Sequence, residues 1–231
     1  MLSNAPQAAL LCGNDSYAQE AFSILKRLWP NRCEIIVLNG NAKPQNFSDL
    51  IRGKALFSFR CHAILSKIEI QSTLFAINFH PAPEDLRGVG GYNFAIYQER
   101  KDFGVLAHIM REEVDSGKIF AIKRFEISDK ETVESLKTKS NIKLLTMFEE
   151  VIISLLGNDG PPDKNLRRFP DVSEWSGALK KRKDLDSLCT IRLGMSDDEM
   201  LKRQRACHYP PDHSLQLKVK DSLFCIKRIL D

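Results

Sequence analysis

The sequence contains no long hydrophobic run, no closely spaced cysteines and no strong excess of charge. No stretch approaches the roughly 18 apolar residues of a membrane-spanning helix, so no membrane partner is expected. Residues 1–7 lack the basic start of a secretory signal, and we therefore expect a cytoplasmic protein. Lysine and arginine (34) exceed aspartate and glutamate (30) by only 4, which does not predict a nucleic-acid partner.

Signatures of metal and dinucleotide sites are also missing. The six cysteines form neither a Cys-x-x-Cys pair nor a zinc-finger spacing, so we expect free thiols and no metal site. No Gly-x-Gly-x-x-Gly follows the first apolar run, so the dinucleotide fingerprint is absent. Gly13, which does follow that run, is interpreted as a turn residue rather than as part of a phosphate cradle.

Apolar runs alternate with amphipathic segments over the first two thirds of the chain. Strands are expected over residues 8–12, 33–38, 55–59, 74–77, 103–110 and 118–127, the last of them at a half-exposed edge of the sheet. Helices are expected over residues 17–28, 48–53 and 132–156, and from residue 92 onward; the apolar stripe of the long helix includes Ile142. This alternation predicts an α/β protein with a Rossmann-like, mostly parallel sheet and flanking helices.

The break at residues 159–163, rich in proline and glycine, predicts a domain boundary. We expect a catalytic domain over residues 1–158 and a C-terminal appendage over residues 159–231, with a helix over 196–207 and a β-hairpin over 215–226. The hairpin leaves both a homodimer and a monomer open. The basic clusters of the appendage are interpreted as a solvated face, with a phosphate or tRNA contact as the alternative. Trp175 is interpreted as a packing residue, with stacking on a base or sugar as the alternative.

The stretch that carries the chemistry follows the apolar run at residues 74–77. Strand alternation places Asn78 and His80 on one face, and Pro81 and Pro83 then end the strand. An amide N–H can stabilise an oxyanion, and an imidazole can move a proton near neutral pH. Asp115, in a turn-like loop, is the candidate carboxylate that orients the imidazole. These three residue types suit acyl transfer to an amine.

The same residues resemble the formyltetrahydrofolate-dependent formyltransferase family, which includes glycinamide ribonucleotide formyltransferase, methionyl-tRNA formyltransferase and the sugar-nucleotide N-formyltransferases. The motifs that carry the resemblance are Asn78-Phe79-His80-Pro81, Arg87-Gly88, His108-Ile109-Met110 and the Val-Asp-x-Gly-x-Ile of residues 114–119. The resemblance implies that Asn78, His80 and Asp115 are catalytic and that 10-formyltetrahydrofolate is the co-substrate. The chain lacks the Leu-Leu-Pro that commonly precedes the family's Arg-Gly. The resemblance therefore does not assign acceptor contacts to this part of the loop. His108 matches a position where the family often has histidine.

Two sets of binding residues are expected. The resemblance implies a pteridine pocket formed by Ala63, Ile64 and Leu65, largely through backbone groups, together with Val114; ordinary core packing is the alternative. Substrate binding is assigned to Arg87, Gly90, Gly91 and Tyr92, because the glycines allow close backbone approach and a helix N-terminus beside them favours an anion. The alternative is a plain loop with Tyr92 packed on the domain.

The nature of the amine acceptor is inferred from the tail. Arg203-x-Arg205-Ala206 followed by a hairpin resembles the tails of sugar-nucleotide N-formyltransferases. We therefore expect formyl transfer to a small phosphorylated amine, first of all a nucleotide-linked amino sugar of the kind used in lipopolysaccharide biosynthesis. The alternatives are a methionyl-tRNA formyltransferase-like enzyme, a glycinamide ribonucleotide formyltransferase-like enzyme and a formyltetrahydrofolate hydrolase. The short chain disfavours the first, the appendage disfavours the second, and the missing regulatory domain disfavours the third. A non-catalytic binding module and a small RNA-binding protein are favoured least.

Overall fold

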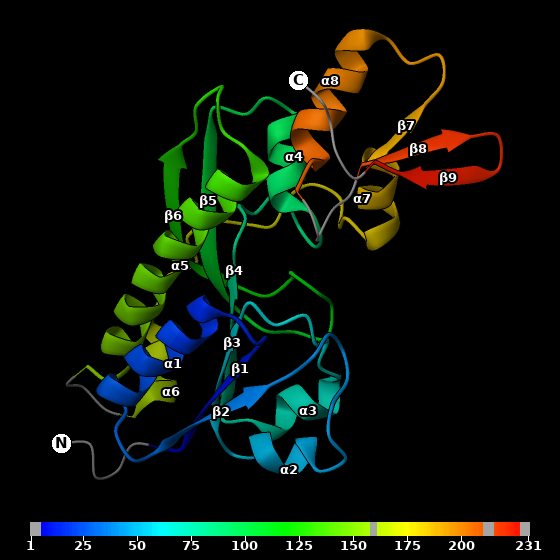
Figure 1. Cartoon of the computed structure of the whole chain (residues 1–231). Helices are drawn as coiled ribbons and strands as arrows, with labels where there is room; N and C mark the ends of the chain where they lie inside the picture. Colours follow the sequence, from blue (N-terminus) through cyan, green and yellow to red (C-terminus); the bar gives the residue numbers. More distant parts are fainter. Residues whose placement is uncertain (1–5, 158–160, 210–214, 227–231) are drawn as a thin grey trace. The chain divides into compact units, whose positions relative to one another are not determined.

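The computed structural model describes residues 6–157, 161–209 and 215–226 (Figure 1). Its main sheet has six strands in the order β2-β1-β3-β4-β5-β6. These strands are β1 (Ala8–Cys12), β2 (Cys33–Val37), β3 (Ala55–Phe59), β4 (Phe75–His80), β5 (Asp102–Ile109) and β6 (Ile119–Glu126). The first four pair in parallel, whereas β5 runs antiparallel to β4. The expected α/β class and mostly parallel sheet are confirmed, and β6 lies at the edge as predicted.

The burial of the strands follows from their place in the sheet. β1 and β3 are buried at every position, as expected for parallel strands that are covered on both faces. β6, at the edge of the sheet, is buried at its first two positions and alternates between half-buried and exposed positions towards its end, as in a strand with one face open to water.

Helices cover both faces of the parallel part of this sheet (Figure 1). They are α1 (Ser16–Leu28), α2 (Phe47–Ile51), α3 (Lys67–Ser72), α5 (Val133–Leu155) and α6 (Pro162–Arg168). On one face, Phe47 and Ile51 of α2 form an apolar cluster with Leu11 and Leu56 of the sheet. On the other face, Phe148 of α5 packs against three aromatic side chains of the sheet, Phe57, Phe59 and Phe79.

The sequence analysis missed or misplaced some details of these helices. The stretch after residue 65 forms the short helix α3, which begins with a capping box between Ser66 and Glu69. Ile142 was expected in the apolar stripe of α5, but 54% of its surface is exposed. Within the described ranges, no helix is long and apolar enough to cross a membrane.

The chain divides into two compact units, each assembled from three separate stretches. The first unit takes Met1–Pro81, Val105–Lys123 and Asn141–Trp175, and the second takes Ala82–Gly104, Arg124–Ser140 and Ser176–Asp231. These units do not coincide with the expected ranges 1–158 and 159–231. That division stays a prediction, and its boundary at residue 158 lies outside the described residues.

The described part of the second unit contains a small sheet in the order β7-β8-β9, the helices α4, α7 and α8, and the start of α5. Its elements are α4 (Gly91–Tyr97), α7 (Arg182–Leu188), β7 (Thr190–Arg192), α8 (Asp197–Cys207), β8 (Gln216–Val219) and β9 (Ser222–Cys225). The expected C-terminal helix and hairpin are confirmed as α8 and β8–β9. Neither α7 nor β7, which pairs in parallel with β8, was predicted.

Polar contacts join α8 to its neighbours in this unit. The side-chain N–H of Asn93 on α4 donates to the Ala206 carbonyl at 2.7 Å. Arg203 donates to the carbonyls of Leu188 and Thr190, at 3.0 and 3.1 Å, and so ties α8 to the turn between α7 and β7. All six cysteines are free, as expected.

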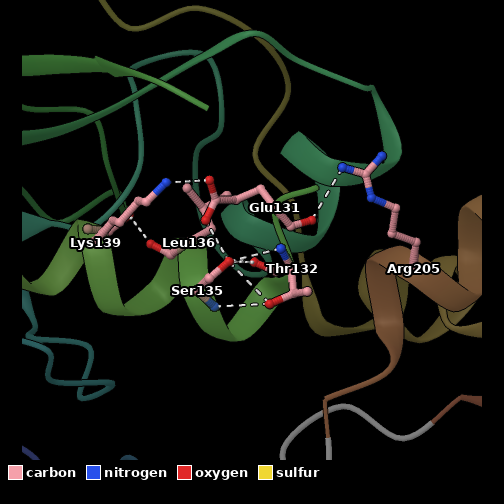
Figure 2. Close-up of polar contacts among 7 residues, drawn as sticks. Glu131, Thr132, Ser135, Leu136, Lys139 and Arg205 are labelled. Atoms are coloured by element: carbon pink, nitrogen blue, oxygen red, sulfur yellow. Dashed lines mark hydrogen bonds and ion pairs between the residues drawn. The ribbon is translucent and has the colours of Figure 1, made fainter. Parts of the chain in front are cut away.

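A buried carboxylate organises the start of α5 in the second unit (Figure 2). Glu131 is 3% exposed and accepts hydrogen bonds from Lys139 at 2.6 Å and from Ser135 at 2.5 Å. Arg205 of α8 donates to the Glu131 backbone carbonyl at 3.3 Å. Burial raises the pKa of the Glu131 carboxyl, but the hydrogen bonds and the Lys139 charge outweigh it, so the pKa lies below its ordinary value.

Glu131→Gln is expected to destabilise the protein by about 1–3 kcal/mol at pH 7, because it removes a charged partner from a buried network. Since the folded state lowers the Glu131 pKa, this stability is present above the unfolded-state pKa and is lost as the pH falls through the folded-state value. Urea unfolding of both proteins at pH 7 and below pH 4 would therefore show a difference that shrinks in acid. The matched control is Glu134→Gln, an exposed neighbour in the first turn; an equal loss there would contradict the assignment.

Candidate active site

The candidate site begins where β4 and β5 lie side by side in the first unit. In the antiparallel register, Asn78 of β4 is directly opposite His108 of β5. Opposite residues point to the same face of a sheet, as do residues two apart on one strand. Asn78, His80 and His108 therefore share one face, which confirms the strand alternation expected for Asn78 and His80.

The hydrogen bonds of His108 fix its tautomer and orient Asn78. Its Nδ1 atom lies 2.9 Å from the Ile109 carbonyl oxygen, which can only accept, so Nδ1 carries the proton. In the neutral ring Nε2 is then an acceptor, and the Asn78 amide, 3.1 Å away, donates to it. An amide NH₂ has two hydrogens. One hydrogen of the Asn78 amide bonds to His108, and the other can still be donated. Asn78 itself is half-buried.

Asp115 lies between the two imidazoles. Its Oδ2 atom is 3.6 Å from Nδ1 of His80, and its Oδ1 atom is 3.5 Å from Nε2 of His108. Both distances are longer than a good hydrogen bond. The backbone of Asp115 has a φ of 47°, a left-handed conformation that aspartate tolerates better than most residues.

The loop around Asp115 is held by a close backbone approach at Gly117. A Cβ atom at this position would overlap the Ile109 carbonyl oxygen and lie 2.8 Å from its carbonyl carbon. The same Ile109 oxygen accepts the His108 proton. Because only glycine fits there, the loop can pack directly onto the end of β5, next to His108.

Trp175 covers this group of side chains. Its ring lies edge-to-face against His80, with centroids 5.7 Å apart, and against His108, with centroids 5.0 Å apart. Its indole N–H donates to the Gly117 carbonyl at 2.6 Å. The side chain thus contacts both imidazoles and the Asp115 loop.

The site combines three chemical groups in a water-poor environment. His80, His108 and Asp115 are each 5% exposed or less. In such surroundings a carboxylate interacts strongly with a positive charge on an imidazole. The arrangement supplies an amide donor for an oxyanion, an imidazole for a proton and a carboxylate that stabilises the imidazolium. Among the described residues, no group of three histidine, cysteine or acidic side chains could hold a metal ion.

The residues expected to line the pteridine pocket differ in their exposure. Ala63 and Leu65 are buried in the apolar cluster under α2, whereas Ile64 is 54% exposed and Val114 is 36% exposed. The backbone N–H of Ile64 already donates to the Asn41 side chain at 2.8 Å. The exposed side chains of Ile64 and Val114 are thus available to an apolar ring, but this N–H is not. The role of all four residues stays a prediction.

The residues expected to bind the acceptor, Arg87, Gly90, Gly91 and Tyr92, belong to the second unit. Gly90 has a φ of 84° and precedes α4, and a Cβ atom at Gly91 would lie 2.7 Å from that of Ala82. Tyr92 packs against the ring of Phe103. These contacts explain the glycines and Tyr92 within the unit, and their part in substrate binding stays a prediction.

Sequence reasoning undervalued two residues of the site. Trp175 was interpreted as a packing or stacking residue, and Gly117 was noted only as part of a motif. No local pattern marks Trp175, because its contacts with His80 and Gly117 join segments far apart in the chain. The glycine two residues after Asp115, in a loop that must return close to its own strand, was the available signal.

Comparison with known proteins supports the resemblance. Residues 59–152 match the family model described as formyl transferase. No curated protein matches the sequence. Two similar solved structures are a sugar N-formyltransferase from Shewanella sp. FDAARGOS_354 (16% identity, TM-score 0.73) and a 4-N formyltransferase from Francisella tularensis (18% identity, TM-score 0.73); each comparison covers 97% of this chain and 98% of the other.

A third similar structure is the N-formyltransferase from Helicobacter canadensis, solved with folinic acid and dTDP-3-aminofucose (14% identity, TM-score 0.71). The comparison covers 94% of this chain and 85% of the other. At these identities the structures establish a common fold. The resemblance to the formyltransferase family is thus confirmed for residues 59–152, and the fold of nearly the whole chain is similar to that of solved sugar N-formyltransferases.

Proposed function

We propose that this chain is an N-formyltransferase that moves the formyl group of 10-formyltetrahydrofolate onto the amine of a nucleotide-linked amino sugar. The observation that carries the proposal is the buried Asp115 carboxylate between His80 and His108, beside an Asn78 amide that keeps one N–H donor. The formyl transferase match covers all of these residues. The Helicobacter canadensis structure, with folinic acid and dTDP-3-aminofucose, supports the choice of donor and acceptor.

In the proposed reaction, the acceptor amine forms a bond to the formyl carbon, and the carbonyl oxygen becomes an oxyanion. The second N–H of Asn78 and protonated His80 donate to this oxyanion. Asp115 orients His80 and stabilises its positive charge. The bond between the formyl carbon and N10 of the folate then breaks. The proton lost by the amine, relayed through a water held by these groups, ends on N10, so a formamide and tetrahydrofolate are the products.

Binding of the folate is assigned to the predicted residues of the first unit. Ile64 and Val114 have exposed apolar side chains that suit an aromatic pteridine or aminobenzoyl ring. Ala63 and Leu65 are buried in the apolar cluster with α2 and hold the segment in place. Arg87, Gly90, Gly91 and Tyr92 remain the proposed residues for the phosphorylated acceptor. A role in lipopolysaccharide biosynthesis and a cytoplasmic location complete the proposal.

A formyl-transfer assay tests it. The protein is incubated with 10-formyltetrahydrofolate and either several nucleotide-linked amino sugars, glycinamide ribonucleotide, charged initiator tRNA or no amine, and release of tetrahydrofolate is followed. Release that depends on one amino sugar, and that is lost in Asp115→Asn, is the expected result. Dependence on another amine would replace the acceptor, and release without any amine would indicate a hydrolase. Absence of both release and folate binding would overturn the proposal.

A further inference from the structure

In the second unit, a distant segment of the chain lies against residues 87–92, the loop proposed to bind the acceptor (the acceptor loop). The backbone N–H of Lys180 donates to the Arg87 carbonyl at 3.0 Å, and the Val89 N–H donates to the Lys180 carbonyl at 3.0 Å. A Cβ atom at Gly88 would lie 2.3 Å from the same Lys180 oxygen, so glycine is needed for this close approach. The backbone of Lys180 is therefore fixed directly beside the acceptor loop.

The side chain of Lys180 also stays close to this loop. Lys180 is half-buried, and its Nζ atom lies over the ring of Phe94, 5.0 Å from the ring centroid. Phe94 is 8% exposed and belongs to α4, the helix that begins within the acceptor loop. A cation over the face of an aromatic ring is attracted to it. This contact keeps the ammonium group next to the N-terminal half of α4.

The carboxylates that precede the acceptor loop are paired with arginines of the same unit. Glu84 pairs with Arg124, and Asp85 pairs with Arg100 at 2.6 Å. Among the residues that the structure describes, no carboxylate lies within ion-pair distance of the Lys180 ammonium group. A half-buried cation without a carboxylate partner attracts an anionic ligand. The charges around the acceptor loop therefore favour a phosphate group at Lys180.

The three basic residues that follow Lys180 differ from it. Lys181, Arg182 and Lys183 are exposed at the start of α7, where water and salt screen their charges. The interpretation of this basic cluster as a solvated face fits these three residues. Of the four, Lys180 is half-buried and is bonded through its backbone to the acceptor loop. Lys180 is thus the member of the cluster that is placed to contact a bound acceptor.

We propose that the Lys180 ammonium group binds the diphosphate of the nucleotide-linked acceptor. This inference rests on the proposed function, because it names a contact of the same substrate. Lysine binds phosphate as a compact point charge, through charge-assisted hydrogen bonds. The contact is made to the phosphates and not to the reacting amine, so it stabilises the bound substrate and the transition state alike. Lys180 thereby selects an amino sugar that carries a nucleotide over the free amino sugar.

Nucleotide binding in the absence of folate tests the inference. Lys180→Met keeps a side chain of similar length over Phe94 and removes the charge, whereas Lys180→Arg keeps the charge. Lys183→Met is the matched control, because it makes the same change at an exposed position of the same cluster. Isothermal titration calorimetry with dTDP and with UDP gives the dissociation constants. We expect Kd to rise about 10- to 100-fold in Lys180→Met and to stay within about 3-fold of wild type in the other two variants.

Two further measurements separate a phosphate contact from a general disturbance of the unit. Thymidine and uridine, which lack phosphates, should not distinguish Lys180→Met from wild type. In the formyl-transfer assay, the acceptor KM of Lys180→Met should rise by the same 10- to 100-fold as Kd, while kcat stays within about 3-fold of wild type. A loss confined to kcat would contradict a binding role. If Lys180→Met does not fold, as judged by urea unfolding, Lys180→Gln takes its place in all of these measurements.

Three results of the binding experiment would overturn the inference. The first is wild-type affinity for both diphosphates in Lys180→Met. The second is an equal loss in Lys183→Met, which would assign the attraction to the whole basic cluster, as expected for a contact with RNA. The third is a wild-type protein that binds neither dTDP nor UDP.

The two proposals fail in different ways. If the wild-type protein transfers no formyl group to any acceptor but binds a nucleoside diphosphate through Lys180, the proposed function fails and the phosphate site stands. If wild type is active and Lys180→Met matches it in acceptor KM and in Kd, only the role of Lys180 is lost.

Discussion

Asp115→Asn is expected to lower kcat for formyl transfer by about 10²–10⁴-fold while the protein stays folded. The carboxylate lies between His80 and His108, and it can accept a hydrogen bond from His80 but has none to donate. An amide of the same shape presents an N–H to one of the two rings and carries no charge to stabilise an imidazolium. The expected loss is therefore one of chemistry, and single-turnover kinetics at saturating donor and acceptor would measure it.

The control for this prediction is Asp129→Asn. Asp129 is an exposed carboxylate, with 78% of its side chain accessible, that pairs with Lys101 on the surface. A pair of this kind contributes little to stability, so the variant should match wild type in both turnover and urea midpoint. If Asp115→Asn kept most of its activity, Asp115 would have no place in the reaction and the roles of His80 and Asn78 would need a new basis.

Gly117→Ala is expected to destabilise the protein by about 3 kcal/mol or more and to abolish most of its activity. The added methyl group would overlap the Ile109 carbonyl, which is backbone and cannot rotate away. Either the loop or the end of β5 must move. Movement of Ile109 would break the hydrogen bond that sets the His108 tautomer, and movement of Gly117 would release Trp175. Urea unfolding and the formyl-transfer assay would measure the two losses.

Gly13→Ala is the matched substitution for Gly117→Ala. Gly13 follows β1 in the same unit, and a Cβ atom at this position would lie 3.4 Å from the Arg60 carbonyl oxygen, an ordinary contact. The same chemical change should therefore cost less than about 1 kcal/mol at this position. Equal stability of the two variants would show that the close approach at Gly117 is relieved without cost, contrary to the geometry of the loop.

The elements with a strong local pattern of apolar residues were predicted from the sequence. The continuous apolar runs of β1 and β3, the long amphipathic α5 and the alternation that places Asn78 beside His80 are all set by residues within one segment. The short elements α3, α6, α7 and β7 were missed. β7 has only three residues, and its pairing with β8 depends on a partner some 25 residues away.

The candidate site was predicted in part for the same reason. Asn78 and His80 follow from one strand, and Asp115 from its motif. His108 was held only as a candidate, because its position opposite Asn78 depends on β5 running antiparallel to β4, which no local pattern specifies. Trp175 reaches the site because Ser173, two residues before it, forms a bridge with Ile119, more than fifty residues earlier in the chain. Such contacts form only when distant segments pack together in the folded protein. The local sequence determines only the secondary structure of each segment.

The placement of Trp175 also makes the site optically visible. The chain has only two tryptophans, and the other, Trp29, is enclosed in the core. An imidazolium quenches indole emission more strongly than a neutral imidazole does. In the Trp29→Phe protein, the remaining fluorescence comes from an indole in contact with His80 and His108. Its intensity therefore reports the charge of these rings, so that proton movement in the site can be followed on the timescale of a stopped-flow experiment without any label.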